Sequence, residues 1–158
     1  MIHTGPFQPR RGLIFNDLTE VIEDVHRLRQ GNRPTGNWTL AQTCHHIADT
    51  LHGSIDGLGV TKHRIMRTLF GRCILRQVFE TNILGDGFTV TKKLNPPDDV
   101  DLDEAVTALK TAIARYHAHT GPLHLHPFFG WLDRAEWDRL HLIHAAHHLK
   151  RLVPHIGD

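Results

Sequence analysis

The segment DRAEWDRLHLIHAAHHLKRLVP, residues 133–154, combines a clear helix signal with the densest group of histidines in the chain. Asp133 and Glu136 form a D-x-x-E pattern, which is typical of a helix N-terminus because these side chains can pair with free backbone N–H groups. Pro154 cannot continue a helix, since it has no backbone N–H to donate. We therefore predict a helix that begins after Asp133 and ends before Pro154.

This predicted helix carries four histidines: His141, His144, His147 and His148. Residues four apart in a helix lie about 40° apart around its axis, so His144 and His148 point the same way, with His141 and His147 to either side. Two imidazoles at this spacing can hold one metal ion, as in the zinc motif HExxH, although the glutamate of that motif is missing. The pair predicts a metal site, with exposed or packed histidines as the alternative, and such a site requires a further ligand.

A third ligand can come from GNWTLAQTCHHIADTLH, residues 36–52. Thr39 and Gln42 form a capping box, which predicts a helix that begins near Trp38. Apolar periodicity places His45 at the edge of the core stripe and His46 nearer the opposite side. The segment offers three histidines in all: His45, His46 and His52. Periodicity by itself leaves open which of them turns inward.

The remaining chain predicts three more helical segments, at residues 17–29, 61–83 and 102–119. Asp17 and Glu20 form a D-x-x-E capping pattern at the start of the first, and the second is broken or kinked near Gly71. Glycines and prolines predict an irregular arm over residues 1–15. A short extended piece is expected at residues 88–91, but no convincing sheet. Helices joined by short loops indicate an all-α fold, an antiparallel bundle that forms one domain over residues 16–158.

Charge and cysteine content restrict the class of protein. The formal net charge of +1 argues against a nucleic-acid partner held through phosphate contacts. No apolar run is long enough to cross a bilayer, and the N-terminal residues lack the apolar region of a signal peptide. Cys44 and Cys73 form no metal or redox motif, so we expect reduced thiols, a cytoplasmic location and a buried structural role for Cys44.

Several other side chains are candidates for supporting roles. Gln42 and Asp49 lie one turn from His46 on either side, so each could orient its ring. The aromatic loop LHLHPFFGW, residues 123–131, offers His124 and His126 as an acid or base above the site. The tryptophan of this loop and the tryptophan of the last predicted helix are expected to lie in the core, not on a surface that stacks against a substrate. These two are Trp131 and Trp137.

Two motifs resemble the DinB-like proteins. GNWTLAQTCHHIAD, residues 36–49, resembles the W-x7-H signature of their second helix, and HAAHH, residues 144–148, resembles their C-terminal H-x-x-x-H. The resemblance implies a four-helix bundle, usually a homodimer, that holds a divalent metal ion through a histidine triad. Counted from Trp38, the first ligand falls on His46 rather than His45, and the other two fall on His144 and His148.

Some DinB-like proteins are bacillithiol- or mycothiol-dependent transferases or isomerases. The resemblance therefore implies a thiol S-transferase that joins a low-molecular-weight thiol to a small electrophilic substrate, with zinc, nickel or another divalent ion. A metal-dependent hydrolase that activates water uses the same triad, and a non-catalytic, metal-stabilised binding module is a third alternative. The arm, the arginine-rich third helical segment and the loop 123–131 differ from the characterised thiol transferases, which leaves the substrate open.

Overall fold

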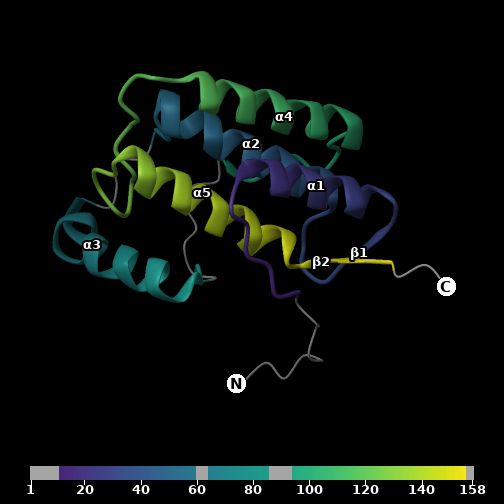
Figure 1. The fold of residues 1–158 in the computed structure, drawn as a ribbon, viewed down its shortest axis with the longest axis horizontal. Coiled ribbons are helices and arrows are strands. Elements are labelled where there is room, and N and C mark those ends of the chain that lie inside the picture. The colour runs from purple at the N-terminus through teal and green to yellow at the C-terminus, as the bar shows by residue number, and fades with distance from the viewer. Residues whose placement is uncertain (1–10, 60–63, 86–93, 156–158) are drawn as a thin grey trace.

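The computed structural model describes residues 11–59, 64–85 and 94–155, and these are mainly helical (Figure 1). The five helices and two short strands are α1 (Leu18–Arg29), β1 (Asn32–Pro34), α2 (Leu40–Asp56), α3 (Arg64–Thr81), α4 (Leu102–Ala118), α5 (Arg134–Leu149) and β2 (Leu152–Pro154). The predicted all-α class holds apart from the small sheet. Residues 1–10 of the predicted arm and the extended piece at 88–91 lie outside the described residues.

The helix starts follow from local hydrogen bonding, as the sequence predicts. The Asp17 side chain accepts hydrogen bonds from the backbone N–H groups of Thr19 and Glu20. Thr39 forms a reciprocal capping box at the start of α2, and Asp133 forms one at the start of α5. Each cap satisfies donors that a helix N-terminus otherwise leaves free.

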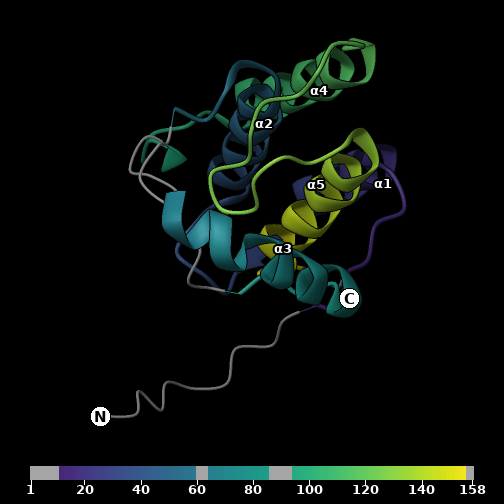
Figure 2. The ribbon, with the colours of Figure 1, turned by 90° about the vertical axis from the view of Figure 1, so that its left-hand side faces the viewer.

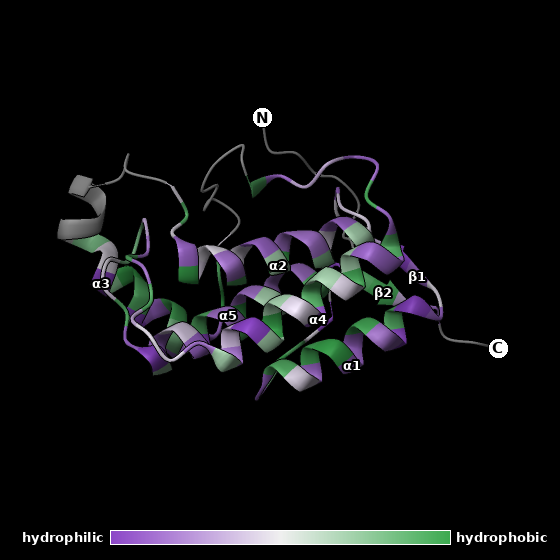
Figure 3. Ribbon diagram, turned by 90° about the horizontal axis from the view of Figure 1, so that it is seen from above, coloured by the Kyte–Doolittle hydropathy of each residue, from purple (hydrophilic) through white to green (hydrophobic). Residues whose placement is uncertain are grey.

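The helices α1, α2, α4 and α5 contact one another, whereas α3 lies to one side of them (Figures 1 and 2). Hydrophobic and hydrophilic residues alternate along α1 (Figure 3), as an amphipathic helix requires. Its buried apolar residues are Leu18, Val21, Val25 and Leu28. Asp24 is buried in the same helix and accepts hydrogen bonds from both terminal nitrogens of Arg11 at 2.7 Å. This ion pair anchors the chain that precedes α1.

Side chains join α3 to α5. Arg72 donates two hydrogen bonds to the Glu136 carboxylate, at 2.7 and 3.1 Å, and Arg139 donates to the Phe79 carbonyl. Of the predicted break or kink near Gly71, the break is wrong, because α3 continues through that position. A Cβ atom there would lie 2.5 Å from the Phe128 carbonyl oxygen. The glycine therefore permits close approach of the loop 126–130 instead of ending the helix.

A two-stranded antiparallel sheet is the feature that sequence patterning misses. Residues 32–34 pair with residues 152–154, with Arg33 opposite Val153. Three-residue strands that each contain a proline carry almost no strand signal. The pairing ties the chain after α1 to the chain after α5. It thereby positions the segment that leads to Trp38 beside the end of α5.

The two cysteines are free, with Cys44 buried and Cys73 exposed. Burial raises the pKa of the Cys44 thiol to about 12, so this side chain packs as a small apolar group, as predicted. Trp137 is buried, as expected, but Trp131 is 72% exposed and the prediction that it lies in the core is wrong. No helix within the described ranges combines the length and apolar character needed to cross a membrane.

Substitution Tyr116→Phe is expected to lower the free energy of unfolding by about 1.5 kcal/mol, because it removes a hydrogen bond to a charged group. The fully buried Tyr116 of α4 donates to Asp138 of α5 at 2.7 Å. Urea denaturation of the two proteins measures the difference. An unchanged midpoint would show that this bond contributes nothing to the packing of α4 on α5.

Candidate metal centre

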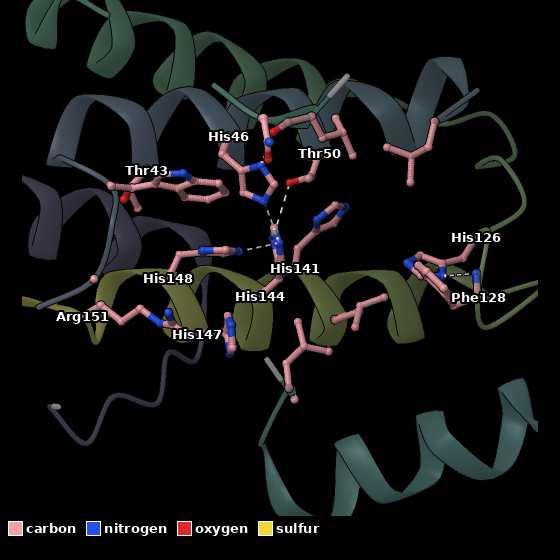
Figure 4. Close-up of a pocket in the computed structure, with 18 of the residues that line it drawn as sticks. Thr43, His46, Thr50, His126, Phe128, His141, His144, His147, His148 and Arg151 are labelled. Atoms are coloured by element: carbon pink, nitrogen blue, oxygen red, sulfur yellow. Dashed lines mark hydrogen bonds between the residues drawn. The ribbon is translucent and has the colours of Figure 1, made fainter. Parts of the chain in front are cut away.

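Three histidines from two helices converge on one point (Figure 4). His46 comes from α2, and His144 and His148 come from successive turns of α5. The Nε2 atom of His144 lies 3.2 Å from that of His46 and 3.1 Å from that of His148. One ligand atom from each residue lies within 4.8 Å of the other two. This close spacing of three nitrogens is the arrangement that a shared metal ion requires.

The ring of His46 is held in the tautomer of an Nε2 ligand. Its Nδ1 atom lies 2.8 Å from the Leu94 carbonyl oxygen. A carbonyl can only accept, so Nδ1 carries the proton and the lone pair of Nε2 faces the other two rings. A backbone carbonyl that fixes a histidine in this way is a common support in metal sites.

His144 has a similar support from α2. The Thr50 hydroxyl donates its proton to the Ile47 carbonyl at 2.9 Å. Its oxygen also lies 3.5 Å from Nδ1 of His144, where it can accept a proton that the ring donates. This contact likewise leaves the Nε2 lone pair of His144 directed at the centre of the triad.

Trp38 packs against two members of the triad. Its indole stacks on the His148 ring at a centroid distance of 5.1 Å and an angle of 18°. It is tilted by 51° to the His46 ring at 4.7 Å. The segment that leads to Trp38 is fixed by Thr35, whose N–H and hydroxyl both donate to the Arg151 carbonyl. The indole therefore holds ligands from α2 and α5 in place.

Substitution Trp38→Leu is expected to weaken metal binding about tenfold, because supporting residues around metal ligands typically contribute a factor of 10–100. Competition with a chromophoric zinc chelator measures the dissociation constant. Trp131→Leu is the matched control, since that indole is 72% exposed and does not line the cavity around the triad. Equal affinities for the Trp38 variant and the original protein would exclude this supporting role.

All three imidazoles are held in the neutral form that metal ligands need. Burial lowers the pKa of His46 and of His144. Burial, and then the neighbouring His46, lower the pKa of His148 to about 2. The positive charge of Arg151 contributes to the lowered pKa of His148. Protons therefore do not compete for these nitrogens near neutral pH.

The rival ligand His45 and the predicted supports Gln42 and Asp49 form contacts other than a hydrogen bond to His46. His45, whose side chain is 34% exposed, lies outside the triad, and its Nδ1 is 3.2 Å from Asp49 Oδ2. Gln42 completes the helix cap and donates to the Pro97 carbonyl at 3.1 Å. Gln42 and Asp49 therefore do not form the hydrogen bond at His46 Nδ1. The Leu94 carbonyl occupies that position, and a backbone group in a loop leaves no side-chain signal in the sequence.

The triad lines a cavity of about 490 Å³, a volume typical of small-molecule sites. His126 lines the same cavity, whereas His124 is exposed and packs near Gly57. The Nδ1 atom of His126 accepts hydrogen bonds from the backbone N–H groups of Phe128 and Phe129. Its proton is therefore on Nε2, and burial lowers its pKa to about 3. The His126 ring is therefore neutral near pH 7, and its acid or base role stays a prediction.

The other two histidines of α5 lie to either side of the triad. His141 is buried between the stacked Trp137 ring at 5.2 Å and the Tyr116 ring at 4.9 Å. Burial lowers its pKa to about 3. His147 is also buried, with its ring 5.0 Å from that of His148. Both line the cavity without joining the triad.

Comparison with known proteins gives a match to a family model over most of the chain. The model of a family described as "Protein of unknown function (DUF1569)" matches residues 7–155. No curated protein and no solved structure matches the chain. The matched region contains Trp38 and all three histidines of the triad.

Proposed function

Starting from the fact that the chain belongs to the DUF1569 family, whose description assigns no activity, we propose that His46, His144 and His148 bind one divalent metal ion. The observation that carries this proposal is the spacing of their Nε2 atoms: those of His46 and His148 lie 3.2 and 3.1 Å from that of His144. The Leu94 carbonyl and the Thr50 hydroxyl support it, because they leave the required lone pairs directed inward.

The three imidazole ligands restrict which metal ions the site can bind. Three imidazoles suit zinc, nickel, copper, cobalt or iron, whereas calcium and magnesium prefer oxygen ligands. Three protein ligands also leave positions open for a small molecule. The same set recurs in the DinB-like proteins that the sequence resembles, so we propose that the chain shares their four-helix bundle, homodimeric assembly and cytoplasmic location.

We further propose a thiol-dependent S-transferase acting on small electrophiles. A divalent ion in this site would supply Lewis acidity that lowers the pKa of a coordinated thiol or water. In the transfer, the thiol loses its proton, its sulfur electron pair forms a bond to an electrophilic carbon, and the leaving group departs with the electrons of its former bond. The cavity supports this reaction because it adjoins the triad and is large enough for two small reactants.

Metal content tests the first part of the proposal. Elemental mass spectrometry of the untagged protein should find close to one equivalent of metal, and the His148→Ala variant should have lost it. A purification tag must be absent, because it would bind metal itself. Absence of metal from the original protein after reconstitution with zinc, nickel, copper, cobalt and iron in turn would refute the site.

A paired activity screen tests the reaction. Electrophiles such as monochlorobimane are incubated with and without a low-molecular-weight thiol, and activated esters are assayed in parallel. Thiol consumption that requires His148 supports the transferase. Ester hydrolysis that needs no thiol but requires His148 would replace it with a metal-dependent hydrolase. Turnover that survives His148→Ala unchanged would exclude the triad from catalysis.

A further inference from the structure

The triad brings no negative charge to the metal it would hold. Its three ligands are neutral imidazoles, and the groups that support them are the Leu94 carbonyl and the Thr50 hydroxyl. In many metal sites a carboxylate occupies one of these positions and offsets part of the charge of the ion. No aspartate or glutamate is among the described residues that line the cavity. A divalent ion here would therefore be held by neutral ligands alone.

The charged residue among those lining residues is a cation. Arg151 follows His148 by three positions, two residues after the end of α5, and lines the same cavity. Its side chain runs along α5 toward His147 and His148 (Figure 4). Its stem packs against Gly36, where a Cβ atom would lie 3.2 Å from Arg151 Cδ. Arg151 therefore adds positive charge on one side of the triad and is held there by the loop before Trp38.

The other end of the cavity is apolar and aromatic. Phe128, Phe129, Trp137 and Leu140 line it. Trp137 precedes the midpoint of His144 and His148 by nine residues on α5, which corresponds to about 13 Å along the helix axis. The His126 ring stacks on Phe129 at 4.5 Å and extends this aromatic wall. The cavity thus runs from a cationic region to a flat, apolar region.

We propose that the cavity binds an organic anion with an apolar body, its charged head near the triad and Arg151 and its body against the aromatic wall. The inference rests on the proposed metal site, because the uncompensated charge of the ion provides most of the preference for an anion. Two effects favour such a ligand. An anion that leaves water needs a positive partner, which the ion and Arg151 provide. An apolar body that leaves water to contact the aromatic wall adds favourable free energy of burial. The substrate of the proposed reaction then belongs to this class.

Three related probes test the proposal on the zinc-loaded, full-length protein by isothermal titration calorimetry. Phenylacetate has both the charge and the apolar body, phenylacetamide lacks the charge, and acetate lacks the body. We expect phenylacetate to bind at least tenfold more tightly than either of the others. Equal affinities of phenylacetate and phenylacetamide would overturn the proposal, as would equal affinities of phenylacetate and acetate.

Matched arginine variants test the role of Arg151. The substitution Arg151→Gln should weaken phenylacetate binding at least fivefold and leave phenylacetamide unchanged, whereas Arg151→Lys should retain most of the affinity. Arg76→Gln is the control, since that side chain is 82% exposed on α3. Equal losses for the acid and the amide in Arg151→Gln would indicate a structural role and overturn the assignment.

Zinc content measured on the same samples distinguishes failure of the metal site from failure of the anion preference. A protein that does not load zinc refutes the metal site and this inference with it. A protein that loads one equivalent of zinc but shows no preference for the anion refutes the inference alone.

Discussion

Substitution His144→Ala is expected to raise the dissociation constant for zinc by more than about 100-fold, because loss of a ligand should exceed the effect of losing a supporting residue. His144 is the central member of the triad, with its Nε2 atom 3.2 Å from that of His46 and 3.1 Å from that of His148. Its removal leaves two ligands on different helices with no nitrogen between them. Competition with a chromophoric chelator measures both dissociation constants.

The control for this experiment is His45→Ala. His45 precedes the ligand His46, but it lies outside the triad with its ring near Asp49. We expect this variant to keep the zinc affinity of the original protein. A similar loss in both variants would mean that His46 is not the ligand from α2. Melting temperatures in the presence of EDTA establish that each variant is folded before zinc is added.

Acidification from pH 7.5 to pH 5.0 is expected to destabilise the metal-free protein by about 2 kcal/mol for each of His126 and His141. Burial lowers the pKa of each ring to about 3 in the folded protein, against about 6.5 in an unfolded chain. Below pH 6.5 the unfolded state therefore binds protons that the folded state rejects. Stability is fully present above pH 6.5 and is lost progressively as the pH falls toward 3. The buried triad histidines act in the same direction.

Urea denaturation in EDTA at several pH values measures this loss. The substitution His141→Phe keeps an aromatic ring between Trp137 and Tyr116 and removes one titrating group. We expect its loss of stability between pH 7.5 and pH 5.0 to be smaller by about 2 kcal/mol. Comparison of the two slopes cancels the contributions of the histidines that do not interact with His141. Parallel slopes would show that His141 is not held neutral by burial.

Local sequence patterns predict much of the fold. The capping residues Asp17, Thr39 and Asp133 locate the starts of three helices, because the hydrogen bonds that they form lie within four residues of the chain. Gly71 shows the limit of such local patterns, because a break predicted there, as the alternative to a kink, does not occur. The demand for glycine there comes from the Phe128 backbone, which is far away in the sequence.

The candidate site likewise combines features that sequence patterns predict with features that they do not. Helical spacing alone places His144 and His148 on one face, whereas apolar periodicity leaves the choice between His45 and His46 open. The resemblance to DinB-like proteins selects His46, and the structure places that residue in the triad. The Leu94 carbonyl at His46 Nδ1 has no counterpart in any sequence pattern, because it is a backbone group.

What the sequence alone determined is therefore local: where the helices begin, which α5 histidines share a face, and that Cys44 is buried. The tertiary structure decided how these parts meet. The pairing of residues 32–34 with 152–154 brings Trp38 beside α5, and the packing of α2 on α5 brings His46 to His144. Periodicity describes only the direction of a side chain from its own helix, whereas a metal site depends on the distances between side chains of different helices.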